Sequence, residues 1–342
     1  MSQPKPFKTI LVGCGSISQA WLNPTVTHPL VEYVGLVDLN IERAEALKAE
    51  YGLTRAQVSA NLAELLTQVE ADLLFDCAVP EVHAEITHLA LQHGCHVLGE
   101  KPLAMTMAEA GGMVEAARAA GKTFAVMQNR RFLDGVIRLR EAIRSGLIGE
   151  LTTLNADFYI GAHFGGFRDE MEHVLLLDMA IHSFDQARFI GACDPLSVYC
   201  HEWNPAGSWY RHGAAAMAIF EMSNGIVFNY RGSWASEGLR TSWECQWRAI
   251  GTKGSIYWDG HELFQGETVT GDDGFFRETA PLDIPTPAPL ANTGHAGLIL
   301  DFLDCLRDGR TPNTIAADNS HSLAMVLAAI ESAETGRKLL FA

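Results

Sequence analysis

The chain of 342 residues lacks any long run of lysine or arginine, and its 41 acidic residues outnumber its 25 basic ones. The resulting net charge of −16 argues against a nucleic-acid backbone or an anionic membrane as a partner, because both require a positive protein surface. An anionic small molecule can still bind, since helix N-termini and backbone N–H groups attract phosphate whatever the net charge. We therefore expect a small-molecule partner.

Cysteine pairs and long apolar runs are also missing. The seven cysteines are odd in number and dispersed, with no Cys-x-x-Cys pair, which predicts free thiols in a reducing compartment. The apolar run Thr9–Val12 is too short, and too soon interrupted by glycine, for a secretory signal. No stretch approaches a membrane-spanning length. We expect a soluble, cytoplasmic protein.

The first part of the chain, residues 1–128, alternates short apolar runs with segments of helical period. The apolar runs do not alternate with polar residues, which is typical of parallel strands covered on both faces. This pattern predicts an α/β domain with a doubly wound, Rossmann-type parallel sheet. The expected strands are Thr9–Val12, Tyr33–Asp38, Leu73–Ala78, His96–Gly99 and Thr123–Met127, and the expected helices are Ser16–Leu22, Ile41–Tyr51, Asn61–Leu66, Glu81–His93 and Met107–Ala120.

The remaining residues, 129–342, predict a second, α+β domain with one large, mostly antiparallel open sheet. Ser223–Gly225 and Gly251–Gly254 have the composition of hairpin turns, which join antiparallel neighbours. Because an open sheet needs a cover for its second face, we expect another subunit there. The expected strands are Leu151–Ile160, Ser197–Trp203, Ala214–Met222, Ile226–Trp234, Trp243–Ile250 and Ser255–Asp259. The other expected elements are a helix Val174–Ile190 ended by Gly191, a proline-rich connector Ala280–Pro289, and the helices His295–Asp308 and Asp318–Thr335.

A dinucleotide-binding fingerprint follows the first strand as Gly13-x-Gly15-x-x-Ser18. Gly13 permits the tight turn, and Gly15 lets the backbone approach a pyrophosphate. Ser18 replaces the third glycine and is small enough for close packing of helix on strand. A simple glycine turn is the alternative, but the flanking strand and helix favour the fingerprint.

Asp38 ends the second expected strand at the distance that the fingerprint requires. A carboxylate there accepts hydrogen bonds from the adenosine ribose hydroxyls and repels a 2′-phosphate. The next residues, Leu39 and Asn40, bring no arginine to such a phosphate. The sequence therefore favours NAD over NADP.

Glu100-Lys101-Pro102 follows the expected strand His96–Gly99. A nucleotide-binding sheet binds its ligand at the carboxyl ends of its strands, so Lys101 is a candidate to polarise a hydroxyl or carbonyl oxygen during hydride transfer. The alternative is a surface Glu-Lys pair at a strand end. We expect the Lys101–Pro102 bond to be cis, because X-Pro bonds are where cis peptides occur.

Asp178 and His182 lie four residues apart on an otherwise apolar expected helix, and Asp185 shares their face. Polar groups on a buried helix need partners, because unpaired buried charge is costly. A structural network and half of a metal site are the alternatives to a catalytic pair. Neither His-Glu-x-x-His nor a Cys/His cluster supplies further ligands, so we expect no metal.

The order of these motifs resembles the glucose-fructose oxidoreductase, inositol dehydrogenase and rhizopine-catabolism (Gfo/Idh/MocA) family over nearly the whole chain. The motifs that carry the resemblance are the glycine fingerprint, Asp38, Pro80-x-x-His83, Glu100-Lys101-Pro102, Asn129-Arg130-Arg131-Phe132 and Asp178-x-x-x-His182. The resemblance implies oxidation of a cyclitol, sugar or related polyol with NAD or NADP, and a dimer or tetramer formed through the open sheet. It implies Lys101, Asp178 and His182 as the catalytic group. The cofactor-binding residues expected on this basis are Gly13, Gly15, Ser16, Ile17, Asp38, Leu39, Pro80, His83, Glu100 and Lys101.

The substrate is harder to predict. Members of the family often have a glycine run before the catalytic Asp, whereas this chain has Glu172–Leu177, so the shape of its pocket differs. The glycine-rich polar segment 161–170 precedes the catalytic helix, as a substrate loop would. The expected substrate contacts are Lys101, Arg131, His163, Arg168, Asp178 and His182.

The expected reaction fits these residue types. Oxidation of a secondary alcohol needs a base for the hydroxyl proton, and histidine suits that task near neutral pH, so we assign His182. Lys101 would stabilise the developing negative charge, and Asp178 would orient Lys101 or His182. The roles of Lys101 and His182 can be exchanged. Two other functions remain open: hydrolysis or elimination through a transient keto intermediate with NAD regenerated each turnover, and a regulator that binds nucleotide without catalysis.

Overall fold

The structure is a computed structural model that describes residues 5–341, and it divides into two compact units. The first unit runs to Phe132 and also takes in Ala291–Leu323. The second unit comprises Leu133–Leu290 and the chain from Ala324 onward. The sequence placed everything after residue 128 in the second domain, so the return of Ala291–Leu323 to the first unit is a correction.

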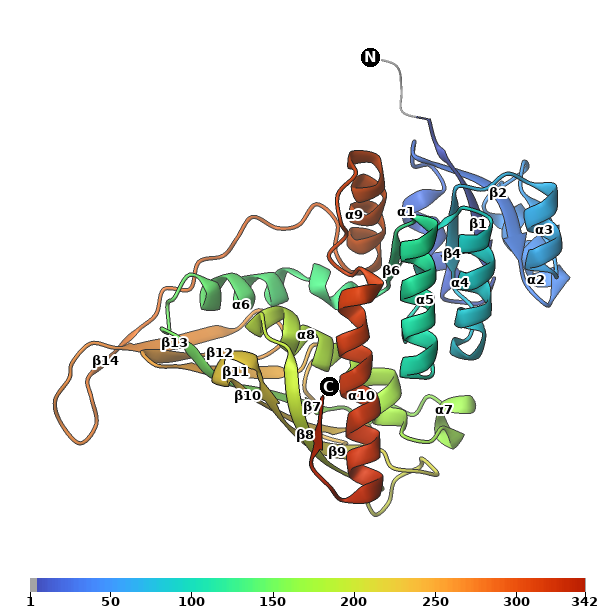
Figure 1. Ribbon diagram of the computed structural model, residues 1–342. Helices are drawn as coiled ribbons and strands as arrows, with labels where there is room; N and C mark the ends of the chain where they lie inside the picture. Colours follow the sequence, from blue (N-terminus) through green and yellow to red (C-terminus); the bar gives the residue numbers. More distant parts are fainter. Residues whose placement is uncertain (1–4, 342) are drawn as a thin grey trace. The chain divides into compact units, whose positions relative to one another are not determined.

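The described residues of the first unit form a six-stranded parallel sheet in the order β3-β2-β1-β4-β5-β6 (Figure 1). This is the strand order of the Rossmann fold, as predicted. The strands are β1 Phe7–Val12, β2 Val31–Val37, β3 Gln57–Ser59, β4 Leu73–Asp76, β5 His96–Gly99 and β6 Phe124–Val126. Of these strands, only the short, polar edge strand β3 was not predicted, because three residues are too few to show the two-residue period of a strand.

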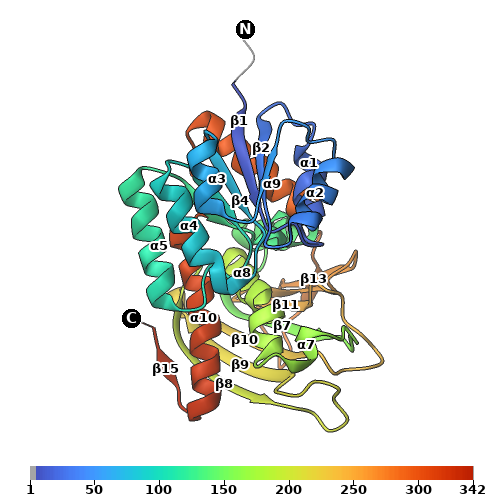
Figure 2. The ribbon, with the colours of Figure 1, turned by 90° about the vertical axis from the view of Figure 1, so that its right-hand side faces the viewer.

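Helices cover this sheet, and contacts place α3, α4 and α5 in succession and α1 beside α9 (Figures 1 and 2). The helices are α1 Ser18–Thr25, α2 Ile41–Glu50, α3 Leu62–Gln68, α4 His83–Gln92, α5 Met107–Ala120 and α9 Gly294–Asp308, with short 3-10 turns η1 Pro80–Val82 and η2 Asn129–Phe132. Helix α9 belongs to this unit because its apolar residues join the core around Trp21 and Phe75. Those residues are Leu298, Ile299, Phe302 and Leu303.

The described residues of the second unit form a nine-stranded sheet in the order β14-β13-β12-β11-β7-β10-β9-β8-β15. All neighbours are antiparallel except β7 and β10, so the prediction of a mostly antiparallel sheet is confirmed, as are both hairpin turns. The strands are β7 Leu151–Tyr159, β8 Pro195–Trp203, β9 Ala215–Met222, β10 Val227–Ser233, β11 Gln246–Gly251, β12 Gly254–Trp258, β13 Phe264–Val269, β14 Thr279–Pro281 and β15 Leu339–Leu340. The sequence missed β13, β14 and β15, which are polar, short or proline-containing.

One face of this sheet carries the helices of the second unit. They are α6 Asp134–Arg144, α7 Phe167–Glu170, the π-helix η3 Leu175–Ala180, α8 Ile181–Gly191 and the C-terminal part of α10 Ala316–Thr335 (Figure 1). The expected single helix is thus a π-helical turn followed by α8. The helix ends one residue later than predicted, since α8 includes Gly191 and the left-handed residue that follows it is Ala192, with φ of 48°. Within residues 5–341, no helix has both the length and the apolarity to cross a bilayer.

Candidate active site

The fingerprint loop joins β1 to α1 at the carboxyl end of the parallel sheet. Gly13 has a φ of +87°, and a Cβ on it would meet the backbone C and O of Cys77 at 2.5 Å. A Cβ on Gly15 would instead meet no described atom within 4 Å, so the space in front of the loop is open. Ser18 is buried and its Oγ donates to the Gly15 carbonyl at 2.6 Å, which confirms that it packs in place of glycine. Ser16 and Ile17 are exposed beside it, as a pyrophosphate-binding loop requires.

Asp38 lies at the end of β2 and is tied to the same loop. Its Oδ2 accepts a hydrogen bond from the Cys14 amide at 2.8 Å, and its Oδ1 accepts one from the Asn40 amide at 2.8 Å. Each oxygen keeps a lone pair for a ribose hydroxyl. Nη1 of Arg43, in the first turn of α2, lies 3.7 Å from Oδ2. We expected no arginine near Asp38 because Leu39 and Asn40 follow it directly, but Arg43 reaches it from the next helix.

Apolar side chains are exposed on the loops that follow three neighbouring strands. Leu39 follows β2 and is 93% exposed, and Val79 follows β4 and is 61% exposed. Ile17, after β1, is less exposed. Exposed apolar side chains at the carboxyl ends of the strands can pack against the rings of a dinucleotide. Together with the open space at Gly15 and the carboxylate of Asp38, they fit NAD.

His83 was expected to contact the cofactor, and the structure corrects this. Pro80 opens the short η1 turn, but the His83 side chain is only 2% exposed, and its Nδ1 lies 2.7 Å from Oδ2 of Asp76. Oδ1 of Asp76 accepts from the Ala78 amide at 3.0 Å. Burial lowers the pKa of His83, but the adjacent Asp76 carboxylate outweighs it, so the net direction is upward. His83 therefore supports the loop after β4 through Asp76.

Glu100 and Lys101 follow β5, and the Lys101–Pro102 bond is cis, as predicted. The Glu100 carboxylate turns inward, since its Oε1 accepts a hydrogen bond from Nε1 of Trp21 at 2.9 Å. Nε2 of His295 lies 3.9 Å from the same oxygen, and Nδ1 of His295 lies 3.1 Å from Nδ2 of Asn129. Burial lowers the pKa of His295, and the charge of Lys101 lowers it further. Glu100 thus anchors the lysine segment to α1 and α9.

Arg131 was expected to contact the substrate, but its guanidinium forms hydrogen bonds with other residues of the protein. Its side chain is 5% exposed. Its Nη1 donates to the carbonyl and the side-chain oxygen of Asn313 at 2.8 and 3.0 Å, and its Nη2 donates to Asp318 at 2.9 Å. These bonds tie η2 to the segment Ala291–Leu323 within the first unit. We therefore assign Arg131 a structural role.

In the second unit, Asp178 lies in the π-helix and His182 in the first turn of α8. Nε of Arg168 donates to Oδ2 of Asp178 at 2.8 Å, and its Nη2 donates to Oδ1 at 3.4 Å. The rings of Phe164 and Phe167 lie 4.9 and 4.8 Å from the Arg168 guanidinium carbon. Such forked, ring-flanked pairs fix the plane of a carboxylate. The loop residue that was expected to bind substrate therefore orients a catalytic candidate. A π-turn at this position is typical of functional sites.

The other expected residues of the second unit separate into buried and exposed ones. His182 and Asp185 are buried. His163 is exposed, its Nε2 lies 2.9 Å from Oε1 of Glu237, and its ring stacks on Trp209 at a centroid distance of 3.7 Å. In segment 161–170, Arg168 thus pairs with Asp178, whereas His163 pairs with Glu237.

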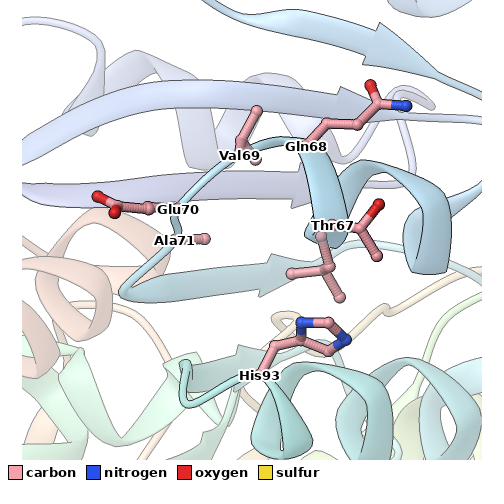
Figure 3. Close-up of a pocket in the computed structure, with 7 residues that line it drawn as sticks. Thr67, Gln68, Val69, Glu70, Ala71 and His93 are labelled. Carbon is pink, nitrogen blue, oxygen red and sulfur yellow. The ribbon is translucent and has the colours of Figure 1, made fainter.

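The described residues contain no group of three or more His, Cys, Asp or Glu side chains arranged to hold a metal ion. All seven cysteines are free, as predicted, and all are buried. A hollow of about 360 Å³ lies beside the loop between α3 and β4, lined in part by Thr67, Glu70 and His93 (Figure 3). It precedes β4 and so lies at the amino end of that strand, opposite the fingerprint.

Comparison with known proteins identifies the two parts of the chain. Residues 7–128 match an oxidoreductase family described as having an NAD-binding Rossmann fold, and residues 136–257 match the GFO/IDH/MocA C-terminal domain. The chain is 27% identical to the 1,5-anhydro-D-fructose reductase of Ensifer adhaerens, over 96% of each protein. It is also 27% identical to the D-apiose dehydrogenase of Paraburkholderia graminis, over 97% of this chain and 89% of that protein.

A solved oxidoreductase of Agrobacterium radiobacter, in complex with NAD+, L-tartaric acid and magnesium, has the same fold. Its TM-score is 0.84 at 22% identity, and 98% of each chain is covered. The matched domains, the strand order and the fingerprint agree, and NAD is the cofactor that they support. The relatives named as reductases or dehydrogenases of sugars indicate an oxidoreductase that acts on CH–OH groups. The chain therefore belongs to the Gfo/Idh/MocA family of oxidoreductases.

Proposed function

We propose that the protein oxidises a secondary hydroxyl of a cyclitol, sugar or sugar derivative with NAD. The ion pair between Arg168 and Asp178 carries the proposal, because it fixes the carboxylate four residues before His182. The full-length relatives named as a reductase of 1,5-anhydro-D-fructose and as a D-apiose dehydrogenase support a sugar-like substrate.

The residues divide the chemistry among them. Bound NAD supplies the hydride acceptor. His182 takes the hydroxyl proton, because imidazole is a suitable base near neutral pH. Lys101 stabilises the negative charge that develops on the reacting oxygen. Asp178, held by Arg168, orients its catalytic partner, and the roles of His182 and Lys101 can be exchanged.

The open sheet supports a homodimer or a homotetramer. Across its strands, Tyr199 pairs with Ile219 and His201 pairs with Met217, and Tyr199, Ile219 and Met217 are about half exposed. Within this chain, Asn229 of β10 donates to Asn155 of β7 at 3.0 Å on the same face. A mixed apolar and polar face of this kind fits a second copy of the sheet.

A panel of cyclitols, sugars and sugar derivatives with NAD, scored by the absorbance of reduced cofactor, tests the function. We expect stoichiometric NADH with at least one secondary alcohol. Formation of product without net NADH would replace the dehydrogenase by the hydrolase or lyase alternative. Binding of NAD with no turnover on any compound of the panel would favour the regulator.

A further inference from the structure

The residue that leads into the helix of Asp178 has an unusual backbone. His173 has a φ of +51°, in the left-handed region that side chains disfavour and glycine adopts readily. Its carbonyl accepts a hydrogen bond from the Leu177 amide at 2.9 Å, so it forms the first turn before the π-helix. A residue held in this region needs surrounding contacts that stabilise it.

The His173 side chain has such contacts on two elements of the second unit. Its Nδ1 lies 2.5 Å from Oε2 of Glu202 on β8, and its Nε2 lies 3.4 Å from Oε1 of Glu334 on α10. Glu202 is 9% exposed, and among the described residues its other oxygen has no hydrogen-bonding partner. Gly213 packs against this carboxylate, since a Cβ there would meet its Cγ at 2.6 Å. His173 therefore provides the short hydrogen bond of a nearly buried carboxylate.

These groups line a cavity of about 240 Å³. The titratable groups around His173 are Glu172 beside it in the chain, Glu202 on β8, His212 before β9 and Glu334 on α10. The carboxylates of Glu202 and Glu334 lie against the two ring nitrogens, and they favour the charged form of the imidazole. The hydrogen bond to Glu202 raises the pKa of His173 above its ordinary value, against the opposing effect of burial, and the charge of Glu334 adds to the increase.

We propose that His173 is a positioning residue: its imidazolium, paired with Glu202, holds the left-handed turn that starts the helix of Asp178 and His182. The proposal rests on the proposed function only in naming those two residues as catalytic. The pairing and the backbone geometry that it stabilises are properties of the second unit alone. Positioning of the helix is then coupled to proton binding at His173.

The sign of this coupling follows from linkage. A histidine whose pKa is raised in the folded protein contributes stability below its unfolded pKa and loses it as the pH rises through the folded pKa. The turn at His173 should therefore be more stable against local opening at about pH 6 than at about pH 9.

Hydrogen–deuterium exchange of the Leu177 amide, corrected for intrinsic rates, measures how often the turn opens. In the unaltered protein we expect its protection to fall by about tenfold between about pH 6 and about pH 9.

Four variants separate the backbone strain from the ion pair. His173→Ala keeps the backbone strain and loses the ion pair, so protection of the Leu177 amide should be low at both pH values. His173→Gly removes the strain as well, so protection should recover and be independent of pH. Glu202→Gln should lower protection at about pH 6. His212→Asn is the matched control and should behave like the unaltered protein.

The exchange experiment needs no substrate, so it remains decisive if the sugar and polyol panel gives no turnover. Unchanged protection and pH dependence in His173→Ala would overturn the proposal. So would an unaltered pH dependence in His173→Gly, because another group would then be titrating. If a substrate is found, the turnover of the unaltered protein should fall as the pH rises above neutral. In His173→Gly this alkaline decrease in turnover should be smaller.

Discussion

Arg168 donates two hydrogen bonds to the carboxylate of Asp178, from Nε at 2.8 Å and from Nη2 at 3.4 Å. The two residues are ten positions apart in the chain. The pair joins the glycine-rich loop to the π-helical turn of the second unit. Segment 161–170 is therefore part of the machinery that orients the catalytic candidates. The rings of Phe164 and Phe167 in the same segment flank the Arg168 guanidinium.

Arg168→Lys should lower turnover by about tenfold or more, because a lysine retains the charge but cannot make the forked contact that fixes the carboxylate plane. NAD affinity should not change, since the fingerprint belongs to the first unit. Arg211→Lys is a suitable control, because Arg211 forms an exposed ion pair with Glu170 in the same region. Steady-state kinetics of both variants check this. Equal turnover in the two variants would contradict the role of Arg168.

Asp38→Ser should narrow the preference for NAD over NADP by about tenfold or more, because the carboxylate that repels a 2′-phosphate is lost while Arg43 remains beside the site. The double variant Asp38→Ser with Arg43→Gln should bind NADP less well than the single one. Dissociation constants for both cofactors provide the test. Tighter binding of NADP than of NAD by the unaltered protein would overturn the cofactor assignment.

The two fingerprint glycines should respond differently to alanine. Gly13→Ala should destabilise the protein by about 1–3 kcal/mol, because its Cβ would overlap the backbone of Cys77 and its φ is positive. Gly15→Ala should leave the melting temperature nearly unchanged, since its Cβ would enter open space among the described residues. It should still weaken NAD binding, because that space is where the pyrophosphate approaches. Thermal unfolding and NAD titration of both variants separate the two effects.

His83→Ala should destabilise the first unit by about 3 kcal/mol, because the buried Asp76 carboxylate would lose its imidazole partner and retain the hydrogen bond from the Ala78 amide. The raised pKa of His83 sets the sign of the pH effect: its contribution is present at low pH and is lost as the pH rises through the folded pKa. Denaturant unfolding from about pH 6 to about pH 9 should therefore show less pH dependence in the variant. A variant as stable as the unaltered protein would contradict the support role.

Features carried by local sequence were predictable, and those that depend on distant contacts were not. The fingerprint, Asp38 and the α/β pattern lie within short segments, and the structure has them in place. The contact of Glu100 with His295 joins residues nearly two hundred positions apart, and no local pattern pointed to it. Arg131 looked available because its partners, Asn313 and Asp318, lie equally far along the chain.

Backbone geometry at single residues was a second limit. A histidine carries no sequence signal for a left-handed φ, so the sequence did not predict the turn at His173. The sequence showed only that this segment lacks the glycine run that is common in the family. In the same way Gly191 was taken as the helix end, although Ala192 adopts that conformation. Strands β3 and β15 are too short for a period of two to be read.

We assign to Lys101 and His182 the proton transfer and charge stabilisation at the reacting hydroxyl of the substrate. Turnover and NAD affinity of His182→Ala and Lys101→Ala, measured side by side on a substrate found in the panel, test this assignment. We expect turnover to fall by about 10²–10⁴-fold in each variant while both still bind NAD. Near-normal turnover in His182→Ala alone would give the role of base to Lys101, and near-normal turnover in both variants would contradict the site.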